Sequence, residues 1–97
     1  MQQSHFKSLP RDLQFLVRLY QDAKVNDVVA LSEVARQIGM LDDTDEERKD
    51  IRNIAKSLVT DGYAVEIDGD FLSITKTGIE RVKLVTSSIE RLEQVGH

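Results

Sequence analysis

Residues 61–75 read DGYAVEIDGDFLSIT, and this stretch decides the fold. Asp61-Gly62 is typical of the end of a helix, because glycine readily adopts the left-handed conformation that terminates one. Asp68-Gly69, placed as a two-residue turn between two apolar arms, predicts a β-hairpin. Thr75 is typical of the cap that starts a helix. We therefore expect a helix, a hairpin and a second helix in succession.

The turn also predicts how the two arms of the hairpin pair. With Asp68-Gly69 at the tip, Val65 lies opposite Leu72 on the face toward the helices, and Tyr63 lies opposite Ile74. The other face then carries Ala64, Glu66, Phe71 and Ser73. A shift by one residue would bring Glu66 to the core side, so we expect this register to be constrained.

Three elements are predicted before the helix end at Gly62. Val28-Val29-Ala30 is predicted to be a very short strand, and Ser32 to cap a two-turn helix that stops at Gly39. Thr44 and Glu47 have the spacing of a capping box, which starts the next helix. The apolar positions of that helix recur at three- and four-residue spacing and are Ile51, Ile54, Ala55 and Leu58.

Two longer amphipathic segments flank these elements. Pro10 precedes a helix of about 13 residues with an apolar stripe, which Phe15 and Leu19 widen, so we expect it to be buried on more than one side. The stripe itself consists of Leu13, Leu16, Val17 and Tyr20. Thr75 precedes a helix from about 76 to 95, whose stripe is Val82, Val85, Ile89 and Leu92.

The composition is that of one soluble domain. The chain has 97 residues, which predicts a single domain over 1–97, with a core at about 9–75 and a C-terminal helix at about 76–95. The absence of cysteine excludes disulfides and thiolate metal sites. No apolar run approaches the length of a membrane span, and the first residues lack the pattern of a signal peptide. We expect a cytoplasmic protein without membrane contact.

The order of elements is that of an α+β domain, and it resembles winged helix-turn-helix transcription regulators of the MarR and PadR kind. The segments that carry the resemblance are residues 31–39, 58–63 and 72–78. It implies that the helix beginning after Thr44 is the recognition helix and that the hairpin is the wing. One departure is that the segment between Gly39 and Ile51 is longer and more acidic than in the compact motif.

The face of the recognition helix opposite its apolar stripe is basic. A helical wheel places Lys49, Arg52, Asn53, Lys56 and Thr60 together, with Arg48 at the flank. Arginine and lysine can donate to guanine, and asparagine can pair with adenine. We therefore predict that this face contacts double-stranded DNA and that Arg48 and Lys76 help to position the DNA backbone. The alternative is an ordinary solvated helix face.

The hairpin and the turn before the recognition helix favour a different partner. The net charge of the chain is −4, and the charged residues of the hairpin, Glu66, Asp68 and Asp70, are all acidic. The alternative function is therefore a winged-helix protein–protein interaction module that binds a basic partner and no DNA. Metal binding by the acids of residues 42–47 is not expected, because the spacing of a calcium loop is absent.

The resemblance also implies assembly, since such regulators dimerise through terminal helices. We expect a homodimer whose interface contains Val82, Leu84, Val85, Ile89 and Leu92. The alternative is that the stripe covers the core of its own chain. No enzymatic function, cofactor or metal is expected, because His5 and His97 have no metal-ligand spacing and no glycine-rich phosphate loop occurs.

Overall fold

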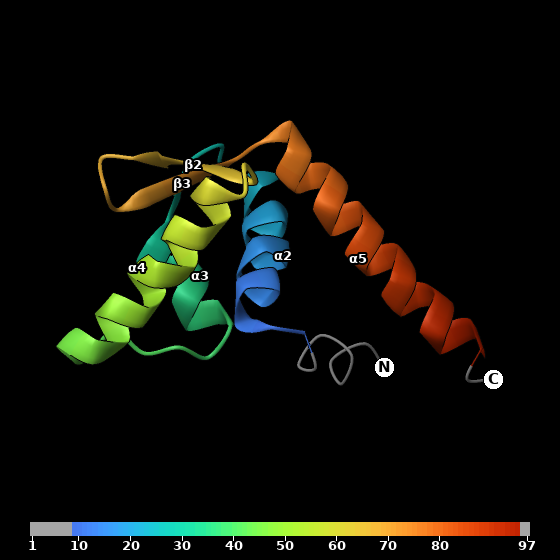
Figure 1. Cartoon of the computed structure of the whole chain (residues 1–97), viewed down its shortest axis with the longest axis horizontal. Coiled ribbons are helices and arrows are strands. Elements are labelled where there is room, and N and C mark those ends of the chain that lie inside the picture. The colour runs from blue at the N-terminus through green and yellow to red at the C-terminus, as the bar shows by residue number, and fades with distance from the viewer. Residues whose placement is uncertain (1–8, 96–97) are drawn as a thin grey trace.

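The computed structural model describes residues 9–95, and it describes side chains as far as Ser87 (Figure 1). Its elements are, in chain order, α2 (Arg11–Ala23), β1 (Val29–Ala30), α3 (Leu31–Gln37), α4 (Asp45–Thr60), β2 (Ala64–Ile67), β3 (Phe71–Ile74) and α5 (Lys76–Val95). Within these residues, four helices accompany one three-stranded antiparallel sheet with the strand order β1-β3-β2. The predicted α+β class and the predicted order of elements are confirmed.

Helix α2 forms the centre of the core. It lies between α4 and α5 and also contacts α3 and β3 (Figure 1). The side chains of Phe15, Leu16 and Leu19 are completely buried. Together with Val17, which is 4% exposed, these residues span about 200° around the helix, so the prediction that α2 is buried on more than one side is confirmed.

Most of the predicted helix ends agree with the structure, but one is wrong. Gly39 and Gly62 have φ of 85° and 81° and follow α3 and α4, as glycine at a helix end does. Ser32 does not cap α3, because the helix begins one residue earlier and has no side-chain cap. The backbone N–H of Leu31 instead donates to the carbonyl oxygen of Asp70 at 2.9 Å. The hairpin thus satisfies one of the N–H groups that have no intrahelical partner at the start of α3.

The predicted hairpin register is wrong by one residue. The observed partners are Ala64 with Ile74, Val65 with Ser73, Glu66 with Leu72 and Ile67 with Phe71. Asp68 and Gly69 have positive φ, as in the predicted turn, but Asp70 is an additional residue in the loop. Its carbonyl oxygen is engaged by Leu31, outside the hairpin, which accounts for the extra residue.

The observed register changes which side chains face the core. Leu72 and Ala64 are buried, whereas Val65 is 52% exposed, contrary to the prediction. Glu66 shares the face of Leu72 but remains exposed: it lies on the edge strand β2, whereas Leu72 lies on the central strand β3 and has a neighbouring strand on each side. Pairing of Leu72 with Val29 of β1 completes the sheet over the core.

Helix α5 begins beside the end of α4. The hydroxyl of Thr75 accepts from the backbone N–H of Gly78 at 3.0 Å, as the predicted cap does, and donates to the carbonyl oxygen of Gly62 at 2.6 Å. The first turns of α5 pack on α2, and its later turns run away from α2 (Figure 1). None of the helices in residues 9–95 is both long and apolar enough to cross a membrane.

Candidate nucleic-acid interface

Helix α4 is stabilised at its start by the predicted cap. The backbone N–H of Glu47 donates to the hydroxyl oxygen of Thr44 at 3.1 Å, and this hydroxyl donates to the Glu47 carboxylate at 3.0 Å. In a capping box the backbone N–H of Thr44 would also donate to the Glu47 carboxylate, and the contact between the two side chains replaces this second bond. Three acids occupy the first turn, where they interact favourably with the helix dipole. The acidic turn therefore has a structural role in starting α4.

The two faces of α4 differ as the helical wheel predicts. Ile51, Ala55 and Leu58 are buried against the core. The opposite, outer face is exposed and carries Lys49, Arg52, Asn53, Lys56 and Thr60. Within the described residues, neither Lys49 nor Lys56 forms an ion pair with a carboxylate. These two ammonium groups are available to an anionic partner.

Arg48 is held within the acidic turn. Its Nη2 lies 2.5 Å from Oδ1 of Asp45, and its Nη1 donates to the carbonyl oxygen of Asp42 at 2.7 Å. Both ends of the guanidinium are therefore engaged by the chain itself. Arg48 thus joins the first turn of α4 to the segment that precedes it, through Asp42. A DNA phosphate would have to compete with both contacts of Arg48.

Arg52 is directed toward the hairpin. Its Nη2 lies 3.8 Å from Oδ1 of Asp70, and the two side chains are 66% and 72% exposed. An ion pair of this length between exposed groups contributes little stability, about 0.2–1 kcal/mol. Arg52 can therefore exchange this contact for another acceptor at small cost, unlike Arg48.

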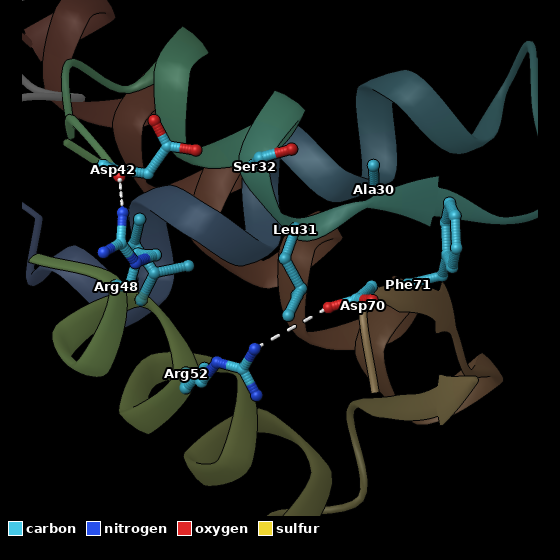
Figure 2. Close-up of a pocket in the computed structure, with 9 residues that line it drawn as sticks. Ala30, Leu31, Ser32, Asp42, Arg48, Arg52, Asp70 and Phe71 are labelled. Carbon is cyan, nitrogen blue, oxygen red and sulfur yellow. Dashed lines mark hydrogen bonds and ion pairs between the residues drawn. The ribbon is translucent and has the colours of Figure 1, made fainter. Parts of the chain in front are cut away.

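A pocket of about 260 Å³ lies between the start of α3, the first half of α4 and the end of the hairpin turn (Figure 2). Its lining combines an apolar floor with both arginines and two aspartates: Ala30, Leu31, Ser32, Asp42, Arg48, Ile51, Arg52, Asp70 and Phe71. The sequence reasoning missed this pocket and the contact between Arg52 and Asp70. No local pattern indicates them, because the hairpin and α4 meet only in the folded chain.

Lys76 lies apart from Arg48, the residue with which it is predicted to position the DNA backbone. It is the first residue of α5 and is exposed. The bond from Thr75 to Gly62 places it beside the C-terminal end of α4, while Arg48 and Lys49 lie near the other end of that helix. The structure therefore brings Lys49, Arg52, Asn53 and Lys56 together and leaves Lys76 apart from Arg48.

The residues predicted for a dimer interface divide into three groups. Val82 and Val85 are 1% and 9% exposed within the single chain, so they pack in its own core, as the alternative interpretation of the stripe expects. Leu84 is 65% exposed. The side chains of Ile89 and Leu92 lie outside the part of the chain whose side chains are described.

The acids of this region do not form a metal centre. Among the described residues, no group of three or more His, Cys, Asp or Glu side chains has an arrangement that could hold a metal ion. His5 and His97 lie outside the described residues.

Relationship to known proteins gives no further assignment. Comparison with known protein families, with curated proteins and with solved structures finds no match for the chain.

Proposed function

We propose that the chain is a winged helix-turn-helix regulator that binds double-stranded DNA, with α4 as recognition helix and the β2–β3 hairpin as wing. The order of α2, β1, α3, α4, β2, β3 and α5 supports this, as does the position of β3 between β1 and β2. In such an arrangement α3 and α4 form the helix-turn-helix, and α4 lies in the major groove.

The observation that carries the proposal is the outer face of α4. Lys49, Asn53 and Lys56 are exposed there at three- and four-residue spacing, and Arg52 lies at the edge of this face. Lysine and arginine donate to guanine or to phosphates, and asparagine makes paired hydrogen bonds with adenine. A rigid helix that presents this set of donors fits the edges of base pairs.

The hairpin determines what kind of binding to expect. Its charged residues are Glu66, Asp68 and Asp70, so it offers no cation to a phosphate. Attraction to DNA must then come mainly from α4, while the hairpin repels the duplex. Such a protein should bind non-specific DNA weakly and should depend on correct base contacts for its affinity.

Assembly as a homodimer is part of the proposal. Two recognition helices related by a two-fold axis would read two half-sites about one helical turn apart. Because Val82 and Val85 are buried in the chain's own core, the interface would use other residues of α5, including Leu84, Ile89 and Leu92.

The proposal is tested by measuring binding to a pool of randomised duplexes at several salt concentrations. Lys56→Ala should weaken binding to all sequences and should reduce the slope of log K against log salt by about one, as expected for one lost phosphate contact. Arg52→Ala should instead relax specificity at one position. Thr77→Ala, an exposed substitution on α5, serves as the control. If the folded wild type binds no duplex at low salt, the DNA-binding function is excluded.

A second candidate is the protein-interaction module, and one observation favours it. Two of the arginines predicted to bind DNA contact acids of the chain itself, Arg48 at Asp45 and Arg52 at Asp70. These pairs reduce the positive potential of α4 beside an acidic hairpin. For this candidate, Lys56→Ala would have little effect, whereas Asp68→Asn combined with Glu66→Gln would weaken binding of a lysine-rich peptide.

A further inference from the structure

We propose that Asp70 is a positioning residue that sets the specificity of Arg52 for one base pair. This inference rests on the proposed DNA-binding function and adds to it the source of discrimination. It assigns to one acid of the hairpin a role that differs from general repulsion of the DNA.

The geometry begins with the backbone of Asp70. Its carbonyl oxygen accepts from the N–H of Leu31 at 2.9 Å, which fixes the end of the hairpin turn against the start of α3. From this anchored position its carboxylate lies 3.8 Å from Nη2 of Arg52. Figure 2 shows the guanidinium of Arg52 extending from α4 across the pocket toward Asp70. Three separate parts of the chain therefore determine where Arg52 points.

A guanidinium with a preferred direction discriminates better than an unrestrained one. Its N–H groups form a rigid planar fork, and recognition of guanine requires two parallel N–H groups to point at O6 and N7 of the base. Asp70 approaches Arg52 through Nη2, so other N–H groups of the fork remain for a base. Because the side chain is already directed, it loses less conformational freedom on binding a correctly placed base.

The same contact acts against incorrect acceptors. An unrestrained arginine reaches any nearby phosphate, and phosphates carry no sequence information. To capture Arg52, a phosphate must replace Asp70 while it is repelled by that carboxylate. The ion pair therefore lowers the affinity that Arg52 adds through non-specific phosphate contacts, and it preserves the affinity that Arg52 adds through a matching base.

The other acids of the hairpin provide a matched control. Within the described residues, Asp68 and Glu66 form no ion pair with an arginine or lysine. Asp68 lies in the same turn as Asp70 and has a φ of 54°, a conformation that asparagine tolerates well. Asp68→Asn and Asp70→Asn thus remove the same charge from the same loop, but only the second removes the partner of Arg52.

The experiment uses the duplex that wild-type protein selects from a randomised pool, together with variants of that duplex changed at each base pair in turn. Asp70→Asn should reduce discrimination at the base pair read by Arg52 by about two- to fivefold, a part of what a whole base contact contributes. Discrimination at the other base pairs should be unchanged. Asp68→Asn should tighten binding to all duplexes by a common factor and should leave the discrimination between them unchanged. Asp70→Glu, which keeps the carboxylate, should restore most of the loss.

A double-mutant cycle separates positioning from a structural effect. In the Arg52→Ala background, Asp70→Asn should cause no further loss of discrimination. Thermal melting checks each variant, and the bond from Leu31 to Asp70 uses backbone atoms that the substitutions retain. The inference is overturned if Asp70→Asn and Asp68→Asn change binding to every duplex by the same factor. Absence of binding by wild type to any duplex would instead overturn the DNA-binding function itself.

Discussion

Gly78 lies where α5 passes closest to the rest of the chain. A Cβ atom at this position would lie 2.2 Å from the carbonyl oxygen of Tyr63 and 2.8 Å from Cγ1 of Ile74. Glycine within a helix normally costs up to about 1 kcal/mol relative to alanine. Here the missing side chain is what allows α5 to contact the backbone between α4 and β2.

We expect Gly78→Ala to lower the free energy of unfolding by about 1–3 kcal/mol, because the contacted atom belongs to the backbone and cannot move aside freely. Urea denaturation followed by circular dichroism measures this change. Thr77→Ala, at the neighbouring exposed position, should be close to neutral. A Gly78→Ala protein as stable as wild type, or more stable, would show that α5 packs differently.

Thr44 and Ser32 are both predicted to cap helices, but in the structure only Thr44 does so. Thr44 accepts a hydrogen bond from the backbone of Glu47, whereas α3 has no side-chain cap. Thr44→Ala should therefore lower the free energy of unfolding by about 1 kcal/mol. Ser32→Ala should change it by less than about 0.5 kcal/mol. Equal losses in urea denaturation would contradict the observed start of α3.

At the scale of elements, the hairpin register buries Leu72 and exposes Val65. Leu72 is fully buried between β1 and the helices, while Val65 is 52% exposed. We expect Leu72→Ala to lower the free energy of unfolding by about 2–5 kcal/mol. Val65→Thr should change it by less than about 0.5 kcal/mol, since threonine is also β-branched and the site is open to water. In the register predicted from the sequence, both substitutions would be strongly destabilising.

The helices could be predicted from the sequence because their signals are local. The stripe of Ile51, Ala55 and Leu58, the cap at Thr44 and the glycine at position 62 lie within the element that they specify. The same wheel predicts the exposed face with Lys49, Asn53 and Lys56, which is most of the candidate site.

The remaining features depend on contacts between distant parts of the chain. The extra loop residue Asp70 and the early start of α3 meet in one contact, the hydrogen bond from Leu31 to Asp70. Neither residue has a local pattern that indicates this bond. The ion pair between Arg52 and Asp70 follows from the same contact, so it could not be predicted before the register was known.

At the scale of the whole molecule, charge is divided between two surfaces. The outer face of α4 presents cations, whereas the hairpin and the turn before α4 present acids, and the net charge is −4. Salt screens attraction at one surface and repulsion at the other. The proposed DNA binding should therefore fall less steeply with salt than in a domain whose wing is also basic.

The proposed dimer leads to a prediction about Leu84. Sedimentation equilibrium should show wild-type dimer at high micromolar concentration, and Leu84→Asp should shift it toward monomer, since a buried unpaired charge is costly. Because Leu84 is 65% exposed in the single chain, the variant should remain folded. Thr77→Asp, which adds the same charge to the start of α5, should leave the dimer intact. Wild type and Leu84→Asp that are both monomeric would exclude this interface.

The hydrogen bond from Leu31 to Asp70 also has a consequence for the order of folding. Within residues 9–95, strand β1 contains two residues and pairs only with β3, which is made from a much later part of the chain. A helix as short as α3, with seven residues, has little stability of its own. The hairpin therefore helps to fix the first residue of α3, while the rest of α3 is held by its packing on α2 and α4. Strand β1, the start of α3 and the hairpin should form and open as one cooperative unit, while α2 and α4 can retain their helical structure.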